Sequence, residues 1–247
     1  MEAWPKGYGL KAFDVIDSTN EEAKRLAQRG EPGPIWISAA RQTAGRGRRG
    51  RTWESPTGNL AATLFLRPGK PAAECAQLSF AAAIAACDTL AGFAPAADVK
   101  VKWPNDVLAD GGKIAGILLE SSGAAGETPD YLAIGIGMNL AMHPQGTEFP
   151  ATSLPALGAR VPQPDDVLLP LAAHLARWIE IWRDQGFAPV RDAWLARAKG
   201  LGTRIRARLA TGEMHGIFEG IDEAGALILR DGQGPAQRIS AGEVFFG

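Results

Sequence analysis

RQTAGRGRRGRTWESPTGNL, residues 41–60, is the stretch around which the rest of the chain is organised. It contains five arginines and no acidic residue before Glu54, and glycines separate four of the arginines. Glycine-rich chain loses much entropy on ordering, and arginines this close repel one another. Free backbone N–H groups beside guanidinium groups suit a phosphate or a carboxylate. We therefore predict that residues 41–53, called the Arg/Gly loop below, order around an anionic ligand.

The Arg/Gly loop also matches two nucleotide-binding motifs in part. Residues 45–50 satisfy the dinucleotide pattern G-x-G-x-x-G, and residues 45–52 differ from a P-loop in having Arg51 where lysine belongs. Both motifs need a helix that begins at the last glycines, whereas residues 52–59 contain a proline, a glycine and no helical period. An RGG-like nucleic-acid tail is a third interpretation, but the loop lies between two strand-like runs. A solvated basic loop is the simplest alternative.

Composition limits the class of protein. The 247 residues carry a net charge of −1 and are 46% hydrophobic, which predicts a globular protein with a local basic feature and disfavours general nucleic-acid binding. Cys75 and Cys87 lie twelve residues apart in one predicted helix, too far for a disulfide, so we expect a reducing, cytoplasmic compartment. The N-terminus has no signal pattern, no apolar run approaches membrane-spanning length, and the histidines are scattered, so we expect neither membrane nor zinc binding.

Periodicity predicts alternating strands and helices over the first 200 residues. Ser18 with Glu21, or Thr19 with Glu22, forms a capping box for a helix that ends near Gly30. Residues 99–103 and 113–120 read as one hairpin around the turn signal Asp110–Gly112. The other predicted strands are 10–16, 35–40, 59–66 and 131–140, and the other predicted helices are 72–91, a long helix capped by Asp165 that ends at Gly186, and 188–199.

The sequence pattern changes after residue 200. Five short strand-like runs follow within about 45 residues, separated by glycine or Asp-Gly, which favours a small β-barrel. They are residues 203–210, 213–221, 226–230, 237–240 and 243–246. We therefore predict a mixed domain over residues 1–200 and a small β module over residues 201–247.

Glycines inside two predicted strands indicate close approach of another group. Gly135 and Gly137 project to one face of their strand, and Asn139 continues that face. Gly116 costs stability in its strand and is typical of a place where a ligand or a backbone comes close. A helix lying close to the sheet would explain the glycines equally well. With the Arg/Gly loop and Lys113, they nevertheless favour phosphate chemistry that depends on positioning and charge.

Five motifs in order resemble the bacterial biotin–protein ligases. They are Ser18-Thr19-Asn20, the run from Gln42 to Trp53, Lys102-Trp103-Pro104-Asn105-Asp106, the run from Lys113 to Glu120, and Gly135-Ile136-Gly137-Met138-Asn139. The similarity covers nearly all of the first domain, and the C-terminal module is also similar to that family's. The resemblance implies an α+β fold: a mixed sheet flanked by helices, like the catalytic domain of class II synthetases, with a C-terminal SH3-like barrel.

The resemblance also implies a reaction with two steps. Biotin and ATP would give biotinyl-5'-AMP and pyrophosphate, with Mg2+ expected on the phosphates and no metal-binding cluster of the protein's own. A lysine of a biotin carboxyl carrier domain would then take the biotinyl group. Because 17 residues precede Ser18, we expect the monofunctional type, which lacks the N-terminal DNA-binding domain of some members. A homodimer through an edge strand is a further possibility.

Residue roles follow from the same motifs. Biotin would contact Ser18, Thr19, Asn20, Gln42, Gly45, Arg46, Gly47, Arg48, Lys113, Gly116 and Gly135. ATP or the adenylate would contact Arg46, Arg48, Arg49, Arg51, Trp53, Asn105, Lys113 and Asn139. The expected catalytic residues are Lys113, Arg46, Arg48 and Asp106, with Asp106 orienting the acceptor lysine or a metal.

Two alternatives stay open. The related lipoate ligases and octanoyltransferases share the fold, but their different Arg/Gly-rich signature with a nearby histidine is not found here. A binding module that grips nucleic acid through the Arg/Gly loop, without chemistry, is the alternative from another class.

Overall fold

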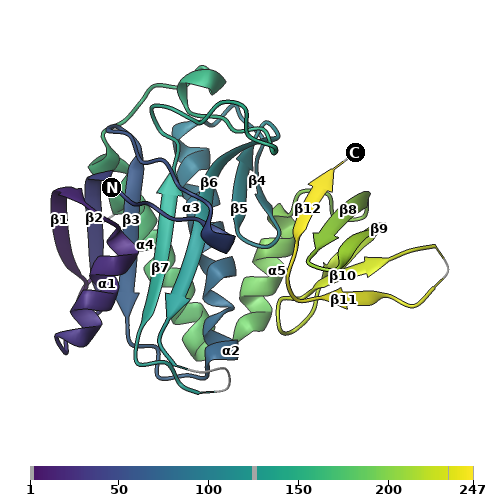
Figure 1. Ribbon diagram of the computed structural model, residues 1–247, viewed down its shortest axis with the longest axis horizontal. Coiled ribbons are helices and arrows are strands. Elements are labelled where there is room, and N and C mark those ends of the chain that lie inside the picture. The colour runs from purple at the N-terminus through teal and green to yellow at the C-terminus, as the bar shows by residue number, and fades with distance from the viewer. Residues whose placement is uncertain (1–2, 124–126, 233, 247) are drawn as a thin grey trace.

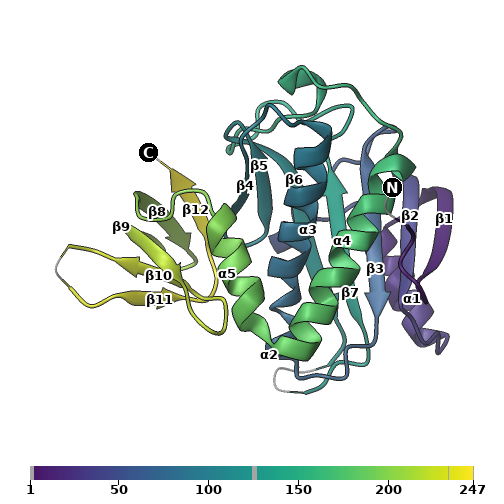
Figure 2. The same ribbon diagram turned by 180° about the vertical axis from the view of Figure 1, so that it is seen from behind.

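The computed structural model describes residues 3–123, 127–232 and 234–246, and its main feature is a sheet with helices on both faces (Figures 1 and 2). In this part of the chain the sheet has seven strands in the order β1-β2-β3-β7-β6-β5-β4. β1 and β2 are parallel and the other neighbours are antiparallel, so the predicted mixed sheet is confirmed. The strands are β1 (Gly9–Ile16), β2 (Ile35–Gln42), β3 (Leu60–Leu66), β4 (Val99–Lys102), β5 (Asp106–Ala109), β6 (Gly112–Ser121) and β7 (Leu132–Met138).

The predicted hairpin between residues 99 and 120 is wrong in one respect. Residues 106–109, which lie outside both predicted strands, form β5 and pair with both β4 and β6. These four residues are all buried, and burial on both faces removes the alternation by which a strand is recognised. The turn itself is as predicted: Asp110 and Gly111 both have positive φ, as a tight hairpin turn requires.

Helix α1 (Thr19–Gln28) covers one face of the sheet, and α3 (Leu78–Phe93) with α4 (Pro164–Gln185) covers the other (Figure 2). The predicted helix 72–91 is two helices, because the N–H groups of Gln77, Ser79 and Phe80 bond to carbonyls three residues back rather than four. The short first piece is α2 (Ala72–Cys75). Cys75 and Cys87 therefore lie in different helices, and both are free and buried.

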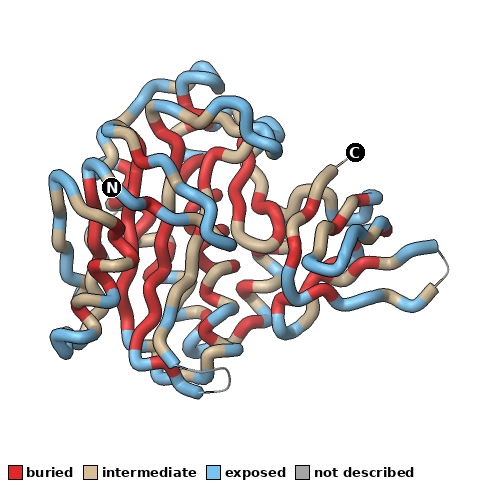
Figure 3. The backbone as a smooth tube through the Cα atoms, viewed as in Figure 1, coloured by how far each residue is buried: buried red, intermediate tan, exposed pale blue. Residues whose placement is uncertain are grey.

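Residues 72–93 are long and apolar enough to span a membrane by composition, but most of this segment is buried in the core. The burial map shows the same pattern, with buried residues concentrated in the central strands and in α3 (Figure 3). Helix α4 begins at Pro164 with Gln163 as its N-cap, so the predicted cap at Asp165 is wrong and that acid lies in the first turn instead. There it still complements the helix dipole.

The last strands form a separate antiparallel sheet, as predicted. In the described residues its five strands run in the order β11-β10-β9-β8-β12. Helix α5 (Phe187–Arg197) joins this sheet to the larger one, and the Trp194 and Phe218 rings lie 6.4 Å apart between their centroids. The strands are β8 (Arg204–Leu209), β9 (Gly212–Ile221), β10 (Leu227–Arg230), β11 (Gln237–Ile239) and β12 (Glu243–Phe246).

Candidate active site

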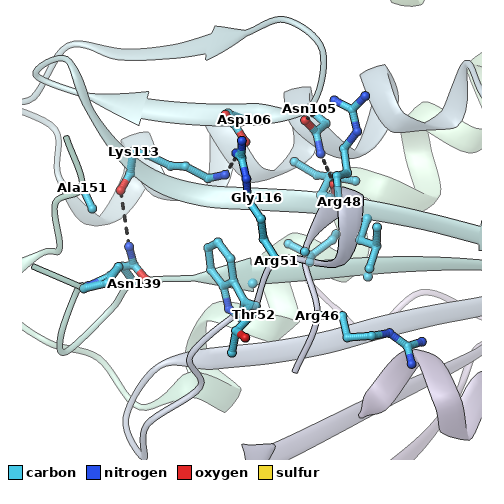
Figure 4. Close-up of a pocket in the computed structure, with 18 of the residues that line it drawn as sticks. Arg46, Arg48, Arg51, Thr52, Asn105, Asp106, Lys113, Gly116, Asn139 and Ala151 are labelled. Atoms are coloured by element: carbon cyan, nitrogen blue, oxygen red, sulfur yellow. Dashed lines mark hydrogen bonds and ion pairs between the residues drawn. The ribbon is translucent and has the colours of Figure 1, made fainter. Parts of the chain in front are cut away.

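A cavity of about 330 Å³ lies where the Arg/Gly loop crosses the larger sheet. Its walls come from the start of α1, the loop, β3 to β7, residues 144–151 and β12 (Figure 4). Of the predicted site residues, only Gly45 is not part of the lining; it is a buried residue of the loop itself. The predicted residues that line the cavity are Ser18, Thr19, Asn20, Gln42, Arg46, Gly47, Arg48, Arg49, Arg51, Trp53, Asn105, Asp106, Lys113, Gly116, Gly135, Gly137 and Asn139.

The glycines of β6 and β7 form the floor of the cavity. A Cβ at Gly137 would lie 2.3 Å from the Trp53 indole, and one at Gly135 would lie 2.4 Å from Asn20 Oδ1. A Cβ at Gly116 would lie 3.1 Å from Trp53 and 3.3 Å from Lys113 Nζ. The glycines therefore make room first for side chains of the site itself, and Trp53 rests on the floor.

One end of the cavity carries a neutral hydrogen-bond network. The predicted capping box is absent, since Ser18 stands at the N-cap of α1 without a side-chain hydrogen bond. Gln42 Oε1 accepts instead from the Thr19 backbone N–H (2.8 Å) and hydroxyl (3.0 Å). Gln42 Nε2 donates to Ser55 Oγ at 2.8 Å, which fixes the orientation of the amide. Gln42, at the end of β2, thus caps the N-terminus of α1 in place of a neighbouring residue.

Thr63 on β3 extends this network from below. Its hydroxyl lies 2.7 Å from Thr19 Oγ1 and 2.6 Å from Asn20 Oδ1, and the side chain is fully buried. Asn20 Nδ2 in turn donates to Glu120 Oε2 at 2.7 Å. Sequence analysis did not select Thr63, because a threonine inside a buried strand carries no distinguishing signal.

The arginines of the loop diverge. Arg46 points toward α1, away from the other charges of the site, and pairs with Glu21 (2.6 Å) and Glu120 (3.1 Å) (Figure 4). The hydrogen bond with Glu21 raises the pKa of Arg46. Arg48 turns inward and donates to Asn105 Oδ1 at 3.1 Å, and burial lowers the pKa of its guanidinium.

Arg51 connects the loop to the C-terminal sheet. It donates to Glu243 Oε2 of β12 at 2.9 Å, and this hydrogen bond lowers the pKa of Glu243. Phe245 of the same strand also lines the cavity, 6.4 Å from the Phe149 ring between centroids. Residues 147–149, Glu243 and Phe245 are site residues that sequence analysis missed, since their approach depends on contacts far apart in the chain.

Asp106 lies between two lysines at the opposite end from the neutral network. Lys113 Nζ is 2.5 Å from Asp106 Oδ1, and Lys102 Nζ is 3.2 Å from Asp106 Oδ2. We call these three residues the lysine–carboxylate cluster. Burial raises the pKa of Asp106, but the charges of Lys113 and Lys102 outweigh it and the pKa lies below its usual value. Asp106 is therefore an ionised, paired carboxylate, and Lys113 is held beside it at the cavity.

The chemistry of the cavity follows from its two ends. Uncharged donors and acceptors line one end, with the Arg46–Glu120 ion pair beside Asn20, and the other lysines and arginines of the lining stand at the opposite end. The Trp53 ring and the apolar residues Ala61, Ile117 and Leu118 also lie in the walls. Such a site suits a ligand with a polar uncharged head, an apolar body and an anionic tail. Among the described residues no group of three His, Cys, Asp or Glu side chains is arranged to hold a metal ion.

Two protein-family models match the chain. Residues 12–139 match the Biotin/lipoate A/B protein ligase family, and residues 200–247 match the Biotin protein ligase C terminal domain. The biotin–[acetyl-CoA-carboxylase] ligase of Paracoccus denitrificans is 53% identical over 240 residues, covering 94% of this chain and 98% of that protein. The bifunctional ligase/repressor BirA of Bacillus subtilis is 36% identical, over 95% of this chain and 73% of its own.

Solved structures give the same relationship. A biotin protein ligase from Aquifex aeolicus in complex with biotin and ATP has a TM-score of 0.81 at 27% identity, covering 96% of this chain and 97% of that one. A biotin protein ligase from Leishmania major in complex with biotinyl-5-AMP has a TM-score of 0.66 at 26% identity, covering 96% of this chain and 100% of that one. The predicted fold class is thereby confirmed.

Proposed function

We infer, from the premise that this chain belongs to the biotin/lipoate A/B protein ligase family, that it is an ATP-dependent biotin–protein ligase. It forms biotinyl-5'-AMP from biotin and ATP and then transfers the biotinyl group to a lysine of a biotin carboxyl carrier domain. The relative from Paracoccus denitrificans, a biotin–[acetyl-CoA-carboxylase] ligase, supports acetyl-CoA carboxylase as the source of that carrier.

The single observation that carries the proposal is the division of the cavity into a neutral end and a cationic end. Biotin has a ureido ring with one carbonyl and two N–H groups, an apolar chain and a carboxylate. Thr19, Asn20 and Gln42 supply uncharged donors and acceptors for the ring, with Ser18 beside them. A network of uncharged donors and acceptors suits the uncharged ureido ring. It rejects a ligand that leaves the buried polar atoms of the network unpaired. Lipoate and octanoate lack such a head.

In the first step the biotin carboxylate oxygen attacks the α-phosphorus of ATP, and the bond to pyrophosphate breaks. Negative charge gathers on the phosphate oxygens, so the protein assists by placing cations there. We assign this role to Lys113, with Arg48 beside it and Arg46 closing from the α1 side. Lys113 leaves Asp106 to do so, and Gly47 contributes backbone contact.

The remaining nucleotide contacts lie around the same end. Arg49 and Arg51 meet the phosphates, while Trp53 and Asn139 flank the adenine. Asn139 Nδ2 donates to the Lys113 carbonyl at 3.3 Å, which leaves its Oδ1 as an acceptor for an amino group (Figure 4). The acids of the cavity, Asp106, Glu148 and Glu243, are each paired with a lysine or an arginine, so Mg2+ would enter with the phosphates of ATP.

In the second step the carrier lysine attacks the carbonyl carbon of the mixed anhydride. The new amide C–N bond forms as the C–O bond to AMP breaks, and AMP leaves with the electron pair. We assign the orientation of the amine to Asp106 and nucleotide contact to Asn105. Closure of the Arg/Gly loop would protect the anhydride from water until the carrier arrives.

Compartment and assembly are part of the proposal. Free, buried Cys75 and Cys87 agree with a reducing cytoplasm. β1 forms the edge of the larger sheet, and Leu10 and Val15 on it are 50% and 56% exposed. An apolar, unpaired edge of this kind can pair with a second copy, which supports a homodimer.

The experiment is pyrophosphate release from Mg-ATP without carrier, with biotin, lipoate and octanoate compared in parallel. Release only with biotin, followed by a biotinyl mass shift on a carrier domain, is the expected result. Release with lipoate or octanoate would leave the fold assignment unchanged but would show that this acid, and not biotin, is the substrate. If none of the three acids gives release, and anion binding falls steeply with salt concentration, the Arg/Gly loop would be a binding site without a catalytic role.

A further inference from the structure

Asp106 is paired with two lysines whose side chains differ sharply in solvent exposure. The Lys102 side chain is 5% exposed, whereas that of Lys113 is 29% exposed. Lys102 belongs to β4 and Lys113 to β6, so they reach the carboxylate from opposite sides of β5. A carboxylate of this kind has one partner that is confined and one partner that faces the cavity.

Aromatic rings confine Lys102. Its Nζ lies 3.9 Å from the centroid of the Phe149 ring and 5.9 Å from that of Phe245. The rings come from the loop after β7 and from β12, so the C-terminal sheet helps to enclose this ammonium. Away from Asp106 this buried ammonium would have no bonded partner, only the aromatic rings and the more distant charge of Glu243, and such a buried charge is strongly destabilising. Lys102 therefore stays with the carboxylate.

Lys113, by contrast, faces the cavity. Its side chain is partly exposed there, and its Nζ lies 5.5 Å from the centroid of the Trp53 ring, so the ammonium can turn toward a ligand. The adenylation step assigned above needs this ammonium at the reacting carboxylate and the α-phosphate. When it moves there, the position 2.5 Å from Asp106 Oδ1 is vacated on the side of the cavity, while Lys102 continues to compensate Asp106.

We propose that Lys102 is a positioning residue that holds the Asp106 carboxylate, and that the acceptor lysine takes the place of Lys113 on that carboxylate during transfer. The proposal rests on the function inferred above and adds to it a lysine-exchange site with one fixed and one replaceable member. The other charges facing Asp106 are Arg48 and Arg51 of the loop and Glu243 of β12.

The acceptor arrives as an ammonium and pairs with Asp106, which stays ionised beside Lys102 and orients the nitrogen. The ammonium loses one proton to water, and the free amine forms the amide bond while the carbonyl C–O bond to AMP breaks. The second proton of the nitrogen also passes to water, AMP leaves with the electron pair, and Lys113 closes on Asp106 again.

The test separates the two half-reactions in the full-length enzyme with Lys102→Met, which keeps the apolar stem against Phe149 and removes the charge. Adenylate formation is read as pyrophosphate release without carrier, and transfer as single-turnover biotinylation of the carrier by enzyme loaded with biotinyl-AMP. We expect adenylate formation to slow, because Lys113 would then leave an uncompensated Asp106, and transfer to slow by at least about tenfold more, since only transfer uses the carboxylate itself to place the acceptor amine. Lys100→Met changes a half-buried lysine of the same strand, which is paired with Asp98 and lies outside the cavity lining, and is the matched control.

A second comparison distinguishes positioning from a general structural role. In an Asp106→Asn background, Lys102→Met should slow transfer no further, because the residue acts only through that carboxylate. Equal slowing of both half-reactions, or additive losses in the double variant, would overturn the proposal. Wild-type enzyme that forms adenylate but does not transfer it would instead overturn the proposed function itself.

Discussion

The indole of Trp53 rests directly on Gly137, so that a Cβ built on this glycine would lie 2.3 Å from Nε1 of the ring. Real Cβ atoms do not approach another atom this closely, and the backbone of β7 is fixed by pairing with β3 and β6. The ring is the part that must move. Trp53 can therefore occupy this position only because residue 137 has no side chain.

Gly137→Ala should displace Trp53 and weaken the nucleotide end of the site. We expect the KM for ATP to rise by about tenfold or more, equivalent to about 1.4 kcal/mol, because the aromatic contact that we propose between Trp53 and the adenine would be lost. Gly92→Ala in α3 is the control, since nothing lies within 4 Å of its Cβ position. Steady-state pyrophosphate release checks both variants, and an unchanged KM for ATP would contradict a role of Trp53 at the adenine.

Gly135→Ala should affect the other end of the cavity. Its Cβ would lie 2.4 Å from Asn20 Oδ1, so Asn20 would be pushed off Thr63 and Glu120. We expect about a tenfold or greater loss of biotin affinity, because a buried amide loses its partners. Calorimetric titration with biotin alone measures this, and the KM for ATP should stay close to wild type. A larger effect on ATP than on biotin would show that the two ends are assigned the wrong way round.

Lys113→Ala should abolish adenylate formation while the fold survives. The variant lacks the charge that we propose stabilises the transition state, but Asp106 keeps Lys102 at 3.2 Å and is not left unpaired. Pyrophosphate release should fall below about a tenth of the wild-type rate, or by more than about 1.4 kcal/mol in activation free energy. A melting temperature near that of wild type is the control for folding. Retention of more than that tenth would remove Lys113 from its central role.

Much of this site could be predicted because its signals are local. The alternation of β7 placed Gly135, Gly137 and Asn139 on one face, and all three line the cavity. The runs of short strands after residue 200 likewise gave the five strands of the smaller sheet. Patterns of period two and turn residues depend on neighbouring positions, so the sequence displays them directly.

The remainder depends on contacts that no local pattern records. Ser18 has the ideal residue type for a cap, yet Gln42, 24 positions later, accepts from the Thr19 N–H. Phe245 reaches the cavity only because the smaller sheet packs against the larger one, and β5 was missed because it is buried on both faces. Tertiary packing decided each of these, and it can override local preference.

Arg48→Ala should release the intermediate rather than weaken biotin binding. Arg48 fastens the Arg/Gly loop to the β4–β5 turn through Asn105 Oδ1 at 3.1 Å, and without it the loop should open more often over the adenylate. We expect faster escape of biotinyl-AMP into solution, measured by rapid filtration of loaded enzyme, with biotin affinity changed less. Arg41→Ala, an exposed arginine outside the cavity lining, is the control. Equal escape from mutant and wild type would refute this role.

Thr63→Val tests whether a residue that does not line the cavity sets its affinity for biotin. The change keeps the shape of the side chain but removes the hydroxyl shared by Thr19 Oγ1 and Asn20 Oδ1. A buried acceptor left unsatisfied costs about 1–3 kcal/mol, so we expect biotin to bind roughly ten- to hundredfold more weakly. Thr63→Ser, which keeps the hydroxyl, should bind nearly as wild type, and the KM for ATP should be the same in all three proteins. A Kd for biotin that is unchanged in the valine variant would show that Thr19 and Asn20 hold their positions without Thr63.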